Sequence, residues 1–354
     1  MDLPFTIALD AMGSDLGPEE IVAGAAIALK KKLTPAGILL VGREDELQSA
    51  LKKHKLQDNP RINTFHASEV IGMDEKPIPS LKKNKDASLV RAVELVKLGT
   101  CSAAVSCGNT GSLMACSTLR LRPLEGIHKP ALATVWPSKD THFVLLDAGA
   151  NPQCKPENLV QYAVLGDLYA KAALGLEKPR VGLLTIGTEE GKGNELTSQT
   201  HELLKSIDGE LINYCGLIEG FQLFNNVVDV VVTDGFTGNI VLKSCESLYK
   251  MLKGLIKEEV KRNPLRLFGA GCLAGAFRNT RKRLDPDLYG GAPMLGLGGL
   301  VIKAHGSSNR NAIANAIRIA GRLVESDHRQ QVIESIQRTN EFIRPSKKRS
   351  GEES

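Results

Sequence analysis

The residues of this chain that could do chemistry lie in short glycine-containing clusters, each of which follows an apolar run. Lys192 and Asn194 belong to one cluster, and His305 belongs to another. Glycine N–H groups, hydroxyls, amides and one or two lysines together suit an oxyanion such as phosphate or carboxylate. The six segments are FTIALDAMGSD (Phe5–Asp15), AAVSCGNTGS (Ala103–Ser112), FVLLDAGAN (Phe143–Asn151), VGLLTIGTEEGKGN (Val181–Asn194), VDVVVTDGFTGN (Val228–Asn239) and GLVIKAHGSSN (Gly299–Asn309). This repeated pattern predicts an anion site.

Each apolar run predicts a strand buried on both faces, so each cluster is the loop at the carboxyl end of a strand. Ligands of open α/β sheets bind at those carboxyl ends. Between the runs, helical spacing and end signals predict an alternation of strands and helices, and therefore an α/β fold with a mostly parallel sheet. The additional strand is Ile38–Val41, and the expected helices are Pro18–Lys32, Arg43–Lys53, Ala87–Leu98, Pro156–Leu174, Asn194–Ile207, Phe236–Arg262 and Asn309–Val332.

The length of 354 residues fits two modest domains or one large two-lobed α/β unit. We expect residues 1–343 to form a single two-lobed catalytic unit, and the polar, serine-rich residues 344–354 to be a disordered tail. The segment Asp74–Lys85 has two prolines and a basic run, which predicts a long loop. That loop is either a solvated connector or a phosphate-facing loop that carries Lys82, Lys83 and Lys85.

Several function classes fit this sequence poorly. The loop GTEEGKGN lacks the spacing and the final Ser or Thr of a nucleotide-binding P-loop. No GxGxxG follows the first strand, and no GxSxG, HExxH or metal-like histidine pair occurs. We therefore expect no metal and no redox cofactor. The seven cysteines, without a CxxC, predict reduced thiols, and the acidic N-terminal residues do not resemble a signal peptide; both favour a cytoplasmic protein.

The positive charge is concentrated in one segment. Residues 243–283 hold 11 basic and three acidic residues, a balance of +8, whereas the net charge of +5 leaves −3 for the rest of the chain. Basic and aromatic residues are not interleaved and aromatics make up only 4%, so nucleic acid is a poor fit. Leu248, Leu252, Leu255 and Ile256 have the spacing of one apolar helical face. The uncharged run Leu267–Phe277 is too short to cross a bilayer but could enter its interface.

Taken in order, the loops DAMGSD, SCGNTG, LLDAGAN, IGTEEGKGNE, VVTDGFTGN and KAHGSS resemble those of the bacterial phosphate acyltransferases of phospholipid synthesis. The resemblance runs from about Ile7 to Ala320. It implies transfer of a long-chain acyl group from acyl carrier protein to inorganic phosphate, giving acyl phosphate for phosphatidic acid synthesis. It also implies a three-layer α/β/α fold like that of the isocitrate/isopropylmalate dehydrogenases, a homodimer, and peripheral contact with the inner face of the cell membrane. The sequence departs from the family pattern at Ser14, Gly17–Pro18 and Leu81–Ser88.

Residues and resemblance together suggest roles at the site. The phosphate dianion is already a nucleophile, so the protein must gather it beside a thioester carbonyl and stabilise the oxyanion that forms. We expect Lys192 to be the central cation, with Asn194 and His305 as further catalytic groups. The expected phosphate-binding residues are Gly108, Asn109, Thr110, Ser112, Asn239 and Ser307, and the acids expected to orient Lys192 and loop amides are Asp10, Asp147 and Asp234.

The basic segment 244–284 has two readings. It is either a helix pair in the core or at a dimer interface, or a surface that meets anionic lipid and acidic acyl carrier protein. The residues expected on that surface are Lys250, Lys253, Lys257, Leu267, Phe268, Leu273 and Phe277. For the whole protein, the alternatives are a short-chain phosphotransacetylase that uses acyl-CoA and a non-catalytic protein that binds acyl carrier protein or lipid. A decarboxylating dehydrogenase is the weakest option, because no clustered acids or nicotinamide signature occur.

Overall fold

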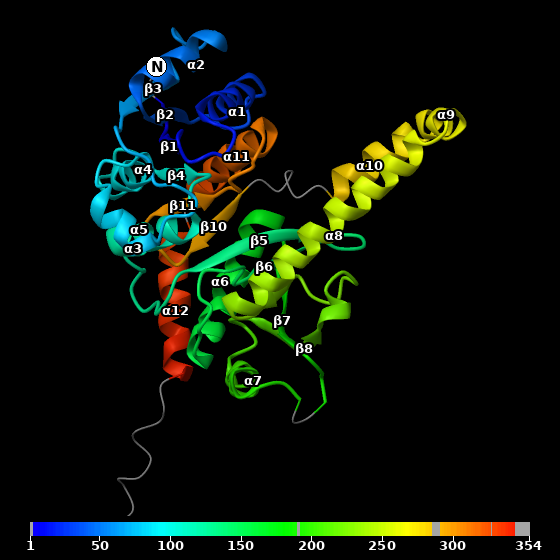
Figure 1. Cartoon of the computed structure of the whole chain (residues 1–354). Helices are drawn as coiled ribbons and strands as arrows, with labels where there is room; N and C mark the ends of the chain where they lie inside the picture. Colours follow the sequence, from blue (N-terminus) through cyan, green and yellow to red (C-terminus); the bar gives the residue numbers. More distant parts are fainter. Residues whose placement is uncertain (1–2, 190–191, 285–290, 327, 344–354) are drawn as a thin grey trace, which may run out of the picture.

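One mixed β-sheet runs through the protein. The computed structural model describes residues 3–189, 192–284, 291–326 and 328–343, and among them it places 11 strands in the order β3-β2-β1-β4-β11-β10-β5-β6-β9-β7-β8 (Figure 1). The strands are β1 (Thr6–Asp10), β2 (Gly37–Gly42), β3 (Ile62–His66), β4 (Ala103–Ser106), β5 (Ala131–Pro137), β6 (His142–Leu146), β7 (Arg180–Thr185), β8 (Asn213–Glu219), β9 (Val230–Val232), β10 (Ala292–Leu295) and β11 (Leu300–Lys303).

The helices follow most of these strands. They are α1 (Pro18–Lys30), α2 (Glu44–Lys53), α3 (Pro77–Lys83), α4 (Ser88–Lys97), α5 (Thr110–Leu121), α6 (Pro156–Leu174), α7 (Glu195–Ser206), the short 3-10 helix Gly220–Gln222, α8 (Gly235–Lys261), α9 (Pro264–Cys272), α10 (Ala274–Leu284), α11 (Arg310–Ser326) and α12 (Arg329–Ile343). Among the helices described here, none is both long and apolar enough to cross a membrane.

The sheet has two parallel halves joined by antiparallel strands. In the first half, β3, β2, β1, β4 and β11 are mutually parallel. In the second half, β6, β9, β7 and β8 are also parallel. Strands β10 and β5 lie between the halves, and β10 pairs antiparallel with β11 and β5, as β5 does with β6. The mostly parallel sheet expected from the sequence is therefore confirmed, and so are the six strands whose ends carry the polar clusters.

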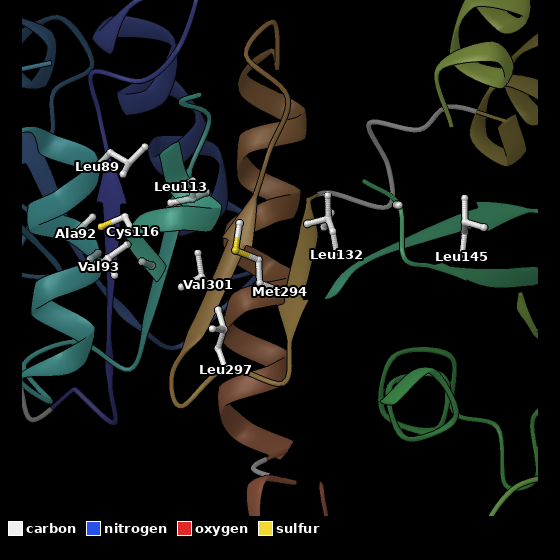
Figure 2. Packing of buried hydrophobic residues seen from close by; sticks show 14 of the residues in the cluster. Leu89, Ala92, Val93, Leu113, Cys116, Leu132, Leu145, Met294, Leu297 and Val301 are labelled. Carbon is white, nitrogen blue, oxygen red and sulfur yellow. The ribbon is translucent and has the colours of Figure 1, made fainter. Parts of the chain in front are cut away.

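Helices cover both faces of the sheet, which confirms the expected three layers. In the first half, α1, α2 and α11 pack on one face around Ile21, Leu47 and Ile317. On the opposite face, α4 and α5 pack on β4 and β11, and this cluster continues through Met294 of β10 and Leu132 of β5 into the second half (Figure 2). The clustered side chains join the two halves into one core. A third cluster holds α6, α7 and α12 against β6, β7 and β9.

Two expected elements differ from the structure. The segment Asp74–Lys85 is not entirely a loop, because α3 begins at Pro77, whose fixed φ suits the first turn of a helix. The expected single helix Asn309–Val332 is two helices, α11 and α12. Helix α11 packs on α1 in the first half, whereas α12 packs on α6 in the second, and one straight helix cannot lie against both. The tail from residue 344 to 354 lies outside the described residues.

Helix α8 extends away from the sheet and carries α9 at its far end (Figure 1). Helix α10 leads back from there, and its Arg283 donates to the carbonyl of Lys139 between β5 and β6. Its apolar face is solvent-exposed in the isolated chain, since Leu248, Leu252, Leu255 and Ile256 are each about half exposed (53, 48, 52 and 52%). The reading of this segment as a helix pair in the core of the chain is therefore wrong. The remaining predictions for this segment are packing in a dimer and contact with the carrier protein or a membrane surface.

Candidate active site

A cavity of about 370 Å³ lies where strand ends of both halves of the sheet meet α8. Thr110 at the start of α5, Gly149 after β6 and His305 after β11 line it, so three of the six polar clusters reach it directly. Asn239, at the end of a fourth cluster, lines it from the first turns of α8. The general expectation that the strand-end loops build the site is therefore supported for these four loops.

The lining of the cavity includes cationic groups. Lys303 is the last residue of β11, and only 8% of it is exposed. Its Nζ donates to the carbonyl oxygens of Cys107, at 3.3 Å, and of Ala304. Lys243 reaches the same space from α8 and is exposed. Two lysines on different elements therefore give the cavity positive charge, which would stabilise a bound phosphate or an oxyanion.

His305 is held in one orientation by Ser307. The backbone N–H of Ser307 donates to Nδ1 of His305 at 3.2 Å, and the Ser307 hydroxyl lies 2.9 Å from the same nitrogen. Burial, followed by the charge of Lys243, lowers the pKa of His305. The ring is therefore neutral at pH 7, and since Nδ1 accepts a hydrogen bond, Nε2 carries the proton. Nε2 lies 3.5 Å from Nζ of Lys243, which also forms an ion pair with Oε2 of Glu246 at 3.4 Å. Two N–H donors and one carboxylate are therefore neighbours here.

The start of α5 is fixed by Asn109. The Oδ1 atom of Asn109 caps the helix by accepting from the N–H of Ser112 at 2.9 Å, and Nδ2 donates to the carbonyls of Met73 (2.6 Å) and Glu75 (3.1 Å). These bonds occupy the amide that we expected to bind phosphate. Ser112 is buried, and its hydroxyl lies 3.4 Å from that of Ser80. Thr110 lines the cavity, whereas Asn109 and Ser112 are not among its lining residues. Their expected contacts with phosphate stay predictions.

Asp10 supports the same loop from β1. It is fully buried, and it accepts from the Ser106 hydroxyl at 2.5 Å and from the N–H of Met12 at 3.2 Å. The Ser106 hydroxyl in turn accepts from the N–H of Gly108 at 3.0 Å. Burial raises the pKa of Asp10, and these hydrogen bonds oppose the shift. The structure therefore shows Asp10 ordering the Gly108 loop, through Ser106, as one part of its expected role.

Asp147 and Asp234 order the loops on the other side of the cavity. Asp147 is fully buried and accepts from the backbone N–H groups of Leu132, Gly149, Ala150 and Asn151 at 2.7–3.1 Å. Asp234 caps α8 by accepting from the N–H groups of Phe236 and Thr237 and from the Thr237 hydroxyl. Gly149 has a φ of +134°, a conformation that favours glycine, and it places backbone beside Asn239.

Lys192 and Asn194 lie apart from this cavity. Nζ of Lys192 lies 3.6 Å from Oε1 of Glu189, and its side chain is 54% exposed. Asn194 is the N-cap of α7, where its Oδ1 accepts from the N–H of Thr197 at 2.9 Å. Neither residue is among those that line the cavity, and in the described part of the chain no carboxylate of Asp10, Asp147 or Asp234 pairs with Lys192. The expected roles of Lys192 and Asn194 stay predictions.

Part of the cavity lining is apolar. It includes Leu132 and Trp136 of β5 and Leu242 of α8. These residues, together with Lys243 and Lys303, were missed as site residues in the sequence. The signal for Lys303 was a lone charge at the end of the apolar strand GLVIK. No local pattern marks Trp136, because β5 reaches the site through antiparallel pairing with β10 and β6.

The basic surface residues divide into two groups. Lys250 and Lys253 line the outer part of the cavity, and Lys257 lies further along α8, exposed. The apolar residues are at the far end, on α9 and α10, and are exposed there: Leu267 58%, Phe268 73%, Leu273 57% and Phe277 43%. In the described residues no group of three or more His, Cys, Asp and Glu is arranged to hold a metal ion.

Comparison with known proteins assigns the chain to a family. A model of the family described as "Fatty acid synthesis protein" matches residues 5–331. The phosphate acyltransferase of Elusimicrobium minutum is 44% identical over 320 residues, covering 90% of this chain and 92% of the relative. That of Heliobacterium modesticaldum is 46% identical over 321 residues, covering 91% and 94%.

Among solved structures, the fold is similar to that of a phosphotransacetylase from Staphylococcus aureus, with a TM-score of 0.59 and 14% identity. The match covers 90% of this chain and 94% of the other, and at this identity it supports the fold alone. Identities above 40% over nine-tenths of both chains decide the assignment: the protein belongs to the phosphate acyltransferase family of fatty acid synthesis proteins.

Proposed function

We propose that this enzyme transfers a long-chain acyl group from acyl carrier protein to inorganic phosphate and releases acyl phosphate for phosphatidic acid synthesis. The observation that carries the proposal is the mixed lining of the cavity. It includes Lys243, Lys303 and His305 together with the apolar Leu132, Trp136 and Leu242. The first three suit a phosphate anion and the last three suit an acyl chain, so one cavity could hold both reactants.

The reaction needs no strong base. A phosphate oxygen attacks the thioester carbonyl carbon, the C–S bond breaks, and the thiolate takes a proton from solvent. The N–H donors of Lys243 and His305 flank one position, where the oxyanion of the tetrahedral intermediate would lie. The start of α5 at Thr110 adds a helix N-terminus that favours bound phosphate. We include the Ser307 hydroxyl and the amide of Asn239 as further donors to phosphate.

Lys192 and Asn194 stay in the proposal because of their place on the sheet. Their loop leaves the carboxyl end of β7, which is parallel to β9, and β9 is parallel to β6. These strands end at the same edge of the sheet, which is also the edge of the cavity. We propose that Lys192 reaches the phosphate or the oxyanion from this edge and that Asn194 donates a hydrogen bond there.

For α8–α10 we propose a peripheral role at the cytoplasmic face of the membrane. The exposed Leu267, Phe268, Leu273 and Phe277 suit the lipid interface, and Lys250, Lys253 and Lys257 suit anionic lipid or the acidic carrier protein. We also propose a homodimer, supported by the exposed apolar residues Phe236 (61%) and Ile240 (51%) at the base of α8. Sedimentation of the purified protein would test the dimer, and an unchanging monomer mass at micromolar concentration would exclude it.

The deciding experiment for the reaction is thiol release from a long-chain acyl carrier protein, with and without inorganic phosphate, while hydroxylamine traps the product. We expect thiol and hydroxamate only when phosphate is present. Release from acetyl-CoA alone would support the short-chain alternative. Binding of the carrier protein without any release would favour a non-catalytic binding protein.

A further inference from the structure

We propose that Lys303 is a further phosphate-binding residue, whose buried ammonium group is the charge partner of the bound anion. This inference rests on the proposed function, since that function makes the anion phosphate. Lys303 lines the cavity and is 8% exposed, in contrast to Lys243, whose side chain is 55% exposed. A charge shielded from water acts on a nearby anion more strongly than an exposed one.

The place of Lys303 in the sheet explains why it can serve this role. It pairs with Ser106 across the parallel strands β11 and β4, so its backbone lies at the carboxyl ends of both. From there Nζ reaches the carbonyl of Cys107, two residues before α5 is capped by Asn109. An ammonium group has three donors. The two carbonyls of Cys107 and Ala304 accept from it, and a third donor is available to a ligand in the cavity.

The charged and titratable groups that act on Lys303 are Asp10 at the end of β1, Asp15 before α1, Cys107 after β4, Lys243 on α8 and His305 in the following loop. Glu246 of α8 lines the same cavity. Burial lowers the pKa of Lys303 to about 8, and Lys243 adds to that effect, whereas Cys107, Asp10 and Asp15 oppose it. A dianion beside Nζ favours the protonated amine and raises its pKa.

Anion binding near pH 8 should therefore take up protons. With the pKa of free Lys303 at about 8, a large fraction of the amine is neutral at pH 8.5 and becomes protonated when the anion binds. Burial holds the pKa of the Cys107 thiol at about 12, so that thiol is already protonated at this pH. The same linkage predicts that anion affinity falls as the pH rises from 7.5 to 9.5.

Calorimetric titration with sulfate, and then with phosphate, tests this directly. Sulfate has no proton to exchange in this range, so any uptake comes from the protein. Titrations at pH 8.5 in two buffers of different ionisation enthalpy give the number of protons bound with each anion. We expect a substantial fraction of one proton in the wild type, and none in Lys303→Met, with anion affinity at pH 7.5 lower by about 10–100-fold in that variant.

Three further variants make the result specific. Lys129→Met is the matched control, because Lys129 also donates to a carbonyl, that of Gln153 at 2.9 Å, but does not line the cavity. Its proton uptake should equal that of the wild type. His305→Gln should keep the uptake, which would separate Lys303 from the neighbouring imidazole. Lys303→Arg keeps a charge that does not titrate at these pH values, so it should bind sulfate without proton uptake.

The inference is overturned if wild-type binding takes up no proton between pH 7.5 and 9.5, or if Lys303→Met takes up as many protons as the wild type. The wild-type titration decides even if the Met variant does not fold. Acyl transfer is measured separately. Sulfate binding with proton uptake but without acyl transfer would contradict the proposed function and leave the role of Lys303 intact. Acyl transfer by an enzyme that binds sulfate without proton uptake would support the proposed function and contradict the role of Lys303.

Discussion

The Nζ atom of Lys243 lies 3.5 Å from Nε2 of His305, although the two residues are 62 positions apart and lie on α8 and after β11. Two donors so close together repel each other unless an acceptor lies beside both. Ser307 fixes the imidazole so that Nε2 carries the proton, and Lys243 supplies the positive charge. Oε2 of Glu246 also lies 3.4 Å from Nζ of Lys243, so Lys243 already has one carboxylate partner. In the proposed reaction, a substrate oxyanion would be a second acceptor beside Lys243 and His305.

Replacing Lys243 by Met should lower turnover by about 10²–10³, the usual cost of removing one donor to an oxyanion. Lys243 is exposed, so the variant should unfold at nearly the wild-type temperature. The measurement is phosphate-dependent thiol release at saturating phosphate and acyl donor. A variant with wild-type turnover would show that Lys243 does not contact the reacting oxygen.

The same substitution should change the titration of His305. The charge of Lys243 is one of the causes that lower the pKa of His305, after burial. Without that charge, the pKa should rise toward the ordinary value of 6.5. Because the folded-state pKa is lowered, His305 supports the folded state above pH 6.5, and this contribution is lost as the pH falls through the folded-state pKa. Histidine NMR titration of the wild type and Lys243→Met tests the shift, and His305→Gln identifies the signal. An unchanged pKa would contradict the pairing.

Asp147→Asn should destabilise the fold by about 2–3 kcal/mol in the free energy of unfolding. The Oδ2 atom of Asp147 accepts from the backbone N–H of Asn151 at 2.7 Å and from its side-chain amide at 3.1 Å. An amide nitrogen placed at this position would oppose two donors. In the other orientation of the amide, the nitrogen would stand at the Oδ1 position and would oppose the backbone N–H groups that donate there. Urea unfolding measures the change. Asp58→Asn, at an exposed position, is the control, and equal stability of both variants would refute the prediction.

The sequence correctly predicted the strands whose ends lie at the site. It did not predict which side chains from different elements contact one another there. Runs such as Val230–Val232 are apolar along their whole length, which is typical of buried parallel strands. Helix α6 begins at Pro156 and ends before Gly175, as those residues predict. Lys243 was visible only as part of a basic helix. Its contact with His305 depends on how α8 crosses the cavity, and a contact across 62 residues has no local signal.

Local sequence patterns also could not predict where the side chains of Asn109 and Ser112 lie. Their cluster, GNTGS, correctly predicts a helix N-terminus, since Asn109 caps α5. The same amide, however, donates to the carbonyls of Met73 and Glu75, and the sequence gives no sign that the segment before α3 lies there. Capping and ligand binding use the same side-chain types, so only the fold separates a residue that holds the loop from one that lines the cavity.

Lys192→Ala should lower turnover by about 10²–10³ if Lys192 stabilises the reacting oxyanion as proposed. The matched control is Lys205→Ala, because Lys205 forms a similar exposed ion pair with Glu202 at 3.2 Å on α7, as Lys192 does with Glu189. That control should retain wild-type turnover. Near wild-type activity of Lys192→Ala at saturating phosphate would remove Lys192 from the mechanism and leave catalysis to the cations that line the cavity.

Charges introduced on α9 should weaken binding to membranes. Leu267 and Phe268 are 58% and 73% exposed, so Leu267→Glu with Phe268→Glu should leave the fold stable. Each apolar side chain of this size contributes about 1.5–3 kcal/mol when it leaves water, and we expect affinity for anionic liposomes to fall by at least about tenfold. Cosedimentation with liposomes, at low and high salt, gives the affinity. Leu119→Glu on α5, at 64% exposure, is the control for a charge placed elsewhere. If the double variant binds liposomes as the wild type does while losing affinity for the carrier protein, the α8–α10 surface serves the carrier instead of the membrane.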